Sequence, residues 1–143
     1  MPYEFLDDIA TADVAFEAWG KTLEEMFISA CEATINVMVS DLASIAEVER
    51  RVLRVENDAL DMLLFDLLQE IIFYKDAEQL LLRVAHVHMA EDNGEFSLTA
   101  WAFGETLNPQ KHDLVVDVKA VTLHRYRVEQ TGRGWEATVI LDI

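Results

Sequence analysis

Two β-hairpin signals in the second half of the chain constrain its fold more strongly than any other feature. Four segments there are rich in β-branched, aromatic and leucine residues: 80–89, 95–103, 118–129 and 134–143. Asn93-Gly94 lies between the first two segments and is typical of a tight hairpin turn. The turn between the last two, residues 130–134, contains Gly132 and Gly134. Strands joined by such short turns pair antiparallel, so we expect two antiparallel hairpins here.

Two further segments have the periodicity of amphipathic helices. The first begins at Thr22 or Leu23, where the sequence has the form of a capping box, and extends to about Val39. Asn57 or Asp58 can cap the second helix. The apolar residues of this second helix fall on one stripe: Leu60, Leu63, Leu64, Leu67, Leu68, Ile71 and Ile72. This stripe must be buried, and we expect it to pack against the strands.

The remaining segments complete an α+β pattern. We expect a short strand in residues 3–8, a second in 14–19 and a third in 45–57, with a loop at 105–117 marked by Pro109. Because the strands do not alternate regularly with helices, a doubly wound sheet is not expected. The sequence predicts a single domain, residues 1–143, with about seven mostly antiparallel or mixed strands packed with two main helices.

The charge of the chain disfavours some partners. Eleven basic residues against 27 acidic ones give a net charge of −16. Phosphate backbones repel such a surface, so we expect no direct binding of nucleic acid. A basic protein partner, a cation or simple solubility all fit this charge, and the charge alone does not choose among them. The oligomeric state is not indicated.

The N-terminus and the single cysteine indicate the compartment. Cys31 is the only cysteine, which excludes a disulfide within the chain and a cysteine-based zinc site. The N-terminus lacks the basic and apolar regions of a signal peptide, and the apolar stretches are too short to cross a membrane. We therefore expect a cytoplasmic protein without a membrane anchor.

Carboxylates are concentrated at the end of the chain. Asp142 and the terminal carboxylate of Ile143 are one residue apart and need a cation or a basic side chain beside them. Ligation by oxygen alone suits Ca²⁺, Mg²⁺ or Mn²⁺ and not zinc. Asp7, Asp8 and Asp13 are the candidates for a third carboxylate. The alternative is a solvated and frayed C-terminus, as most chain ends are, and this feature alone favours the alternative.

Other residues with chemical potential give weaker signals. His86 and His88 lie two apart in a predicted strand and can share one face, but surface or core histidines are the favoured interpretation. Lys119 can neutralise the acidic cluster or approach a phosphate, or it can reach solvent from a strand edge. No glycine-rich phosphate loop, GxSxG or HExxH motif is present. The residues alone therefore give no complete catalytic set.

Several segments, in this order, resemble the archease family. The matching segments are Thr11 to Phe27, Asp58 to Glu70, Gly104-Glu105, Lys111-His112, Val118 to His124 and Leu141 to Ile143. The resemblance implies a divalent metal held by Asp13, Asp142 and Ile143, and a functional role for Lys119. The approach to Asp13 departs from the family pattern: a histidine is lost and two residues are added, which makes Asp8 an additional candidate ligand.

The family resemblance also implies a function. Archease-like proteins assist the RtcB-type tRNA-splicing RNA ligase by promoting guanylylation of that enzyme and its multiple turnover. The chain is then a metal-binding accessory protein and not itself an enzyme, with the ligase as its protein partner. Two other interpretations stay open: an independent metal-dependent phosphohydrolase that uses the same carboxylates, and a chaperone-like interaction protein with a structural ion.

Overall fold

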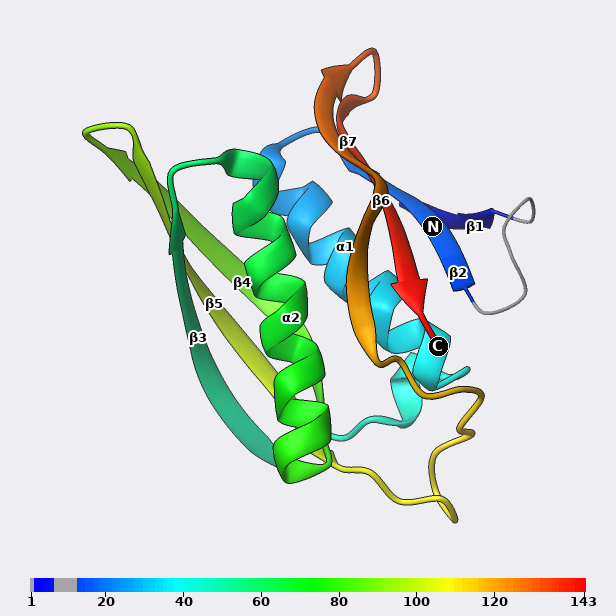
Figure 1. Cartoon of the computed structure of the whole chain (residues 1–143). Helices are drawn as coiled ribbons and strands as arrows, with labels where there is room; N and C mark the ends of the chain where they lie inside the picture. Colours follow the sequence, from blue (N-terminus) through cyan, green and yellow to red (C-terminus); the bar gives the residue numbers. More distant parts are fainter. Residues whose placement is uncertain (1, 7–12) are drawn as a thin grey trace.

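The protein contains two antiparallel sheets with helices between them (Figure 1). The computed structural model describes residues 2–6 and 13–143. One sheet has the strand order β1-β2-β7-β6 and the other the order β3-β5-β4. The first contains β1 (Tyr3–Leu6), β2 (Asp13–Gly20), β6 (Ala120–Thr131) and β7 (Gly134–Asp142), and the second β3 (Glu49–Asn57), β4 (Leu80–Asp92) and β5 (Glu95–Thr106).

The helices form the layer between these sheets. Helix α1 (Leu23–Met38) contacts β2 and β7 on one side and β4 on the other. Helix α2 (Leu60–Glu78) contacts the three-stranded sheet, β6 and α1. The leucine and isoleucine stripe of α2 is therefore buried against strands, as expected, and also against α1. Within the described part of the chain, seven strands and two α-helices confirm the predicted α+β class, and every strand pairing is antiparallel.

Both predicted hairpins are present. Asn93 and Gly94 join β4 to β5 and have φ angles of 53° and 78°, the left-handed values that a two-residue hairpin turn requires. The second hairpin joins β6 to β7, and its ladder is interrupted between Thr122 and Arg127. No helix in the described ranges is both long and apolar enough to cross a membrane.

The helix starts differ in detail from the predictions. The hydroxyl of Thr22 accepts a hydrogen bond from the backbone N–H of Glu25, as in a capping box. The Glu25 carboxylate, however, accepts from the backbone N–H of Lys21 and not from that of Thr22. The cap predicted for α2 is wrong: Ala59 occupies the position before the helix, without a side-chain cap. The side chain of Asn57 instead accepts from the Ala59 N–H, so it stabilises the turn that precedes the helix.

The strand predicted from residue 45 begins only at Glu49. The preceding residues Leu42–Ser44 form a short 3₁₀ helix (η1), which the Asp41 carboxylate caps through the Ala43 N–H. The N–H of Ala46 donates to the carboxylate of Glu105 at 2.7 Å and is therefore not available to a strand ladder. Because of these side-chain contacts, β3 begins at Glu49 and not at residue 45.

Candidate metal centre at the C-terminus

Asp13 and Asp142 face each other at the end of the ladder between β2 and β7. They are directly opposed, and they form the last of the pairs that join these two strands. Opposed residues of an antiparallel pair project from the same face, with Cβ atoms about 4.5–5.5 Å apart. The two carboxylates therefore start from neighbouring backbone positions although they come from opposite ends of the chain.

Buried apolar residues fix the register that brings Asp13 to Asp142. Phe16 lies opposite Val139, and both are fully buried, as is Leu141. With β2 in place, a slip of β7 by one residue would turn Val139 and Leu141 to the other face of the sheet, away from the helices. The hydrophobic core therefore specifies which residues meet at the end of the ladder.

The last residues of the chain are held in place. The side chain of Ile143 is half-buried and packs against the hydrophobic core. The backbone N–H of Lys119 donates to the carbonyl oxygen of Asp142 at 2.8 Å. The backbone that carries the Ile143 carboxylate is therefore anchored directly after Asp142.

The other candidate residues are placed as follows. Lys119 lies one residue before β6 begins, so its prediction as a strand residue is wrong, and its side chain is exposed. The Val118 side chain is buried and the backbone N–H of Lys119 donates a hydrogen bond to β7, so the chain joins the sheet at this point. Asp8 lies outside the described residues, as does Asp7.

The oxygen atoms available at this site are of the kind that hard cations prefer as ligands. Asp13 and Asp142 supply carboxylate oxygens, and the Ile143 terminus supplies a third carboxylate. Oxygen ligands of this kind suit Ca²⁺, Mg²⁺ or Mn²⁺. In residues 2–6 and 13–143 no group of three His, Cys, Asp or Glu side chains is arranged to hold a metal. Such a site therefore depends on the terminal carboxylate or on a ligand outside these ranges.

The motif residues Glu105 and His112 anchor the loop between β5 and β6. The Glu105 carboxylate accepts hydrogen bonds from Ala46 N–H, from the Lys111 ammonium at 2.6 Å and from His112 Nε2 at 3.0 Å. These donors, with the backbone N–H of Ala46 first, lower the pKa of Glu105 to about 2. His112 Nδ1 accepts from the N–H of Asn108 at 2.9 Å, which leaves Nε2 as the donor to Glu105.

Gly104 is required by a close approach of two backbones. A Cβ at this position would lie 1.7 Å from the carbonyl oxygen of Leu81 on the neighbouring strand β4. No rearrangement of a side chain relieves this contact because the obstructing atom belongs to the backbone. The Gly-Glu and Lys-His motifs of the sequence therefore have a structural explanation, separate from the metal ligands.

Lys75 is a buried cation that the sequence analysis did not identify. Its ammonium group donates to carboxylate oxygens of Asp76 and Asp117 and, at 2.7 Å, to the Val118 carbonyl oxygen. Burial alone would lower the pKa of Lys75, but the hydrogen bonds to Asp117 and Asp76 outweigh it and raise the pKa. The signal was its spacing, since Lys75 lies four residues after Ile71, on the apolar stripe of α2.

His86 and His88 are surface residues of β4. Both are exposed and lie on either side of the buried Val87, so they share the outer face of the sheet. The ring of His86 stacks against Trp101 with centroids 5.2 Å apart. In the residues that the structure describes, no third ligand joins them. Their exposed positions agree with the interpretation of both as surface histidines.

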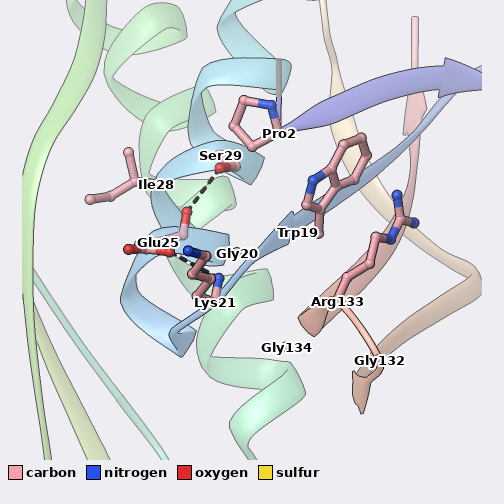
Figure 2. A pocket seen from close by; sticks show the side chains of 10 residues that line it. All are labelled: Pro2, Trp19, Gly20, Lys21, Glu25, Ile28, Ser29, Gly132, Arg133 and Gly134. Carbon is pink, nitrogen blue, oxygen red and sulfur yellow. Dashed lines mark hydrogen bonds between the residues drawn. The ribbon is translucent and has the colours of Figure 1, made fainter.

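A groove of about 920 Å³ lies at the opposite end of the β2–β7 ladder (Figure 2). The guanidinium of Arg133 lies over the Trp19 ring, 4.1 Å from its centroid. Lys21 and Glu25 lie together on the other side of the groove, where α1 starts. Seven residue steps along β2 separate the pair containing Gly20 from the pair containing Asp13, roughly 24 Å at the rise of an antiparallel strand. The groove is therefore not part of the candidate metal centre.

Known proteins of similar sequence and structure identify the family. The archease protein family (MTH1598/TM1083) matches residues 3–143. An archease of Methanosarcina mazei is 37% identical over 142 residues, covering 99% of this chain and 95% of its own length. An archease of Pyrococcus furiosus is 32% identical, covering 93% of this chain and 94% of its own.

Two solved structures are also similar to this protein. The solution structure of Methanobacterium thermoautotrophicum protein 1598 has a TM-score of 0.85 and 34% identity, with 99% of both chains covered. A crystal structure from Thermotoga maritima, described as an archease and possible chaperone, has a TM-score of 0.55 at 17% identity and 98% of both chains covered, and shows the fold alone. The match over almost the whole sequence confirms the resemblance seen in the motifs, and the chain belongs to the archease family.

Proposed function

We propose that this protein is a metal-binding accessory protein that activates an RtcB-type tRNA-splicing RNA ligase by promoting its guanylylation and multiple turnover. The observation that carries the proposal is the opposition of Asp13 and Asp142 next to the anchored C-terminal carboxylate of Ile143. Membership of the archease family supports it. The protein acts on its partner ligase and has no substrate of its own in this proposal.

Charge supports the choice of partner. With a net charge of −16 the protein presents a strongly acidic surface. A ligase that binds RNA and GTP needs a basic surface, and complementary fields accelerate and orient the encounter of two such proteins. The acidic surface is then a docking feature, and it disfavours direct contact with RNA phosphates.

The residues of the chain have distinct roles in this proposal. Asp13, Asp142 and the Ile143 carboxylate hold the ion, and a bound divalent ion neutralises phosphate charge in guanylyl transfer. The Lys119 backbone fixes Asp142 through the 2.8 Å hydrogen bond, while its exposed ammonium is free to reach an anionic group of the partner. Phe16 and Val139 keep the two aspartates in register.

A guanylylation assay tests the proposal. A cognate ligase is incubated with GTP and Mn²⁺, alone, with the wild-type protein and with Asp142→Ala. We expect Asp142→Ala to abolish the stimulation while its circular dichroism spectrum and melting temperature stay near those of the wild type. Asp92→Ala, an exposed carboxylate at the β4–β5 hairpin, is the matched control and should stimulate fully.

Two results would contradict the proposal. Full stimulation by Asp142→Ala would remove the metal centre from the mechanism. Turnover of nucleotides by the protein with Mn²⁺ but without any ligase would instead favour an independent phosphohydrolase.

A further inference from the structure

Strand β3 forms an open edge of the three-stranded sheet. It pairs with β5 through nine residues, and in the described part of the chain no strand lies on its other side (Figure 1). Alternate residues of an antiparallel strand direct their N–H and C=O groups away from the neighbour. About half of the backbone groups of β3 are therefore available to another strand.

The outer face of this edge combines an apolar position, Val52, with the charged residues Arg50, Arg54 and Glu56. Val52 of β3 is 43% exposed, and its partner in the ladder, Trp101, is 42% exposed. Natural proteins protect long sheet edges by shortening, twisting, charging or covering them, because an open edge pairs with other chains. Val52 and Trp101 offer an apolar contact at this edge, and the charged residues of β3 restrict pairing to a strand of complementary charge.

An acidic groove runs beside the edge on the face that carries α2. It has a volume of about 490 Å³. Its lining residues are Val55, Glu56, Asp66, Gln69, Glu70 and Phe73. Three of these are carboxylates, none is basic, and Phe73 is largely exposed. A strand added at this edge should therefore carry arginine or lysine side chains.

Strand β3 itself contains arginines: Arg51 alternates with the buried Leu53 and Val55 and so lies on the face of the groove, whereas Arg50 and Arg54 lie on the outer face. We propose that two copies of this chain pair antiparallel through β3 and form a continuous six-stranded sheet around a two-fold axis at Leu53. The dimer does not rest on the proposed function, and it leaves the C-terminal carboxylates free because they belong to the other sheet.

The charges of β3 are complementary to themselves in this register. When Leu53 lies opposite Leu53 of the second copy, Arg50 lies opposite Glu56, and the two-fold axis repeats this pair. Arg51 then lies opposite Val55, which lines the acidic groove. Opposed charges of unlike sign stabilise a strand pair, and like charges destabilise it.

The neighbouring registers are less favourable. A shift of two residues places Arg50 opposite Arg54 in one direction and Arg54 opposite Arg54 in the other. A shift of one residue would place the helix-facing side chains of one copy opposite the outward-facing side chains of the other. In the isolated chain Arg50 bonds to Glu47 at 2.7 Å, and both side chains are exposed, so little stability is lost when Arg50 changes partner.

Sedimentation equilibrium tests the proposal. The chain has a mass of 16.3 kDa, so the dimer has twice that mass, 2 × 16.3 = 32.6 kDa. Glu56→Arg or Arg50→Glu creates two like-charged pairs across the axis, and each should raise the dissociation constant by roughly tenfold or more. The double variant Arg50→Glu/Glu56→Arg exchanges the charges and should restore the dimer.

A control and a second measurement locate the interface. Glu95→Arg, an exposed charge at the β4–β5 hairpin, should leave the dissociation constant unchanged. Hydrogen exchange of the β3 amides should slow as the protein concentration rises, in the wild type and in the double variant only. A wild-type mass of 16.3 kDa up to about 100 μM, or failure of the double variant to restore the dimer, would overturn the proposal.

Discussion

The ammonium group of Lys75 lies 2.7 Å from the carbonyl oxygen of Val118. This hydrogen bond joins the last turn of α2 to the residue that precedes Lys119, whose N–H in turn binds Asp142. A buried helix residue is thus connected, through two consecutive backbone groups, to the end of β7. The position of the candidate metal centre depends on this connection as well as on the strand ladder.

Removal of this cation should weaken the loop before β6. Lys75 is only 6% exposed, and its loss leaves the Val118 carbonyl without that donor. Because the carboxylate partners are themselves largely exposed, we expect Lys75→Ala to lower the free energy of unfolding by about 2 kcal/mol. Urea denaturation measures this, and Lys21→Ala, on the surface at the start of α1, should change it by less than about 0.5 kcal/mol.

Gly104 should tolerate no side chain. The Cβ of an alanine would lie 1.7 Å from the Leu81 carbonyl oxygen, so β4 and β5 must separate locally. We expect Gly104→Ala to cost at least about 3 kcal/mol of stability, measured by thermal or urea unfolding. Gly132→Ala is the matched control, because a Cβ at Gly132 meets no atom within 4 Å. Equal stability of the two variants would contradict this explanation of Gly104.

The hydrogen bonds of the Glu105 carboxylate to Ala46, Lys111 and His112 should make the free energy of unfolding depend on pH in the acid range. The pKa of Glu105 is about 2 in the folded protein and about 4.3 in an unfolded chain. The contribution of the carboxylate is therefore complete above about pH 4.5 and is lost as the pH falls toward 2. The stability difference between the wild type and Glu105→Gln should be largest near neutral pH and should shrink between pH 4.5 and 2.

Chemical denaturation at a series of pH values measures this difference. Glu95→Gln, at the exposed hairpin, serves as the control and should follow the wild type at every pH. A difference between the wild type and Glu105→Gln that stays constant with pH would show that the carboxylate charge is not the stabilising feature.

Metal affinity should depend on the free C-terminus. Residues added after Ile143 move the terminal charge away from Asp13 and Asp142, and we expect Mn²⁺ affinity to fall by about tenfold or more. Isothermal titration calorimetry measures the affinity, and the guanylylation assay measures the consequence for the ligase. The same residues inserted between Asn93 and Gly94, in the exposed hairpin turn, should change neither. Unaltered Mn²⁺ binding by the extended chain would exclude the terminal carboxylate as a ligand.

The sequence by itself determined the local elements of this protein. The leucine stripe of α2, the Asn93-Gly94 turn and the alternation within the strands act between residues close in the chain, so their periods are visible without coordinates. Local signals failed where side chains competed with the backbone. Asn57 stabilises a turn and does not cap α2, and Glu105 takes the N–H of Ala46.

Only the tertiary structure decided which distant residues meet. The opposition of Asp13 and Asp142, the burial of Lys75 and the open edge of β3 each depend on how strands and helices pack. Family resemblance grouped Asp13 with the C-terminus, but no local pattern gives the register, which the buried pair Phe16 and Val139 fixes through the core. Periodicity specifies an element and its apolar face, whereas the partner of that face is chosen by packing over the whole chain.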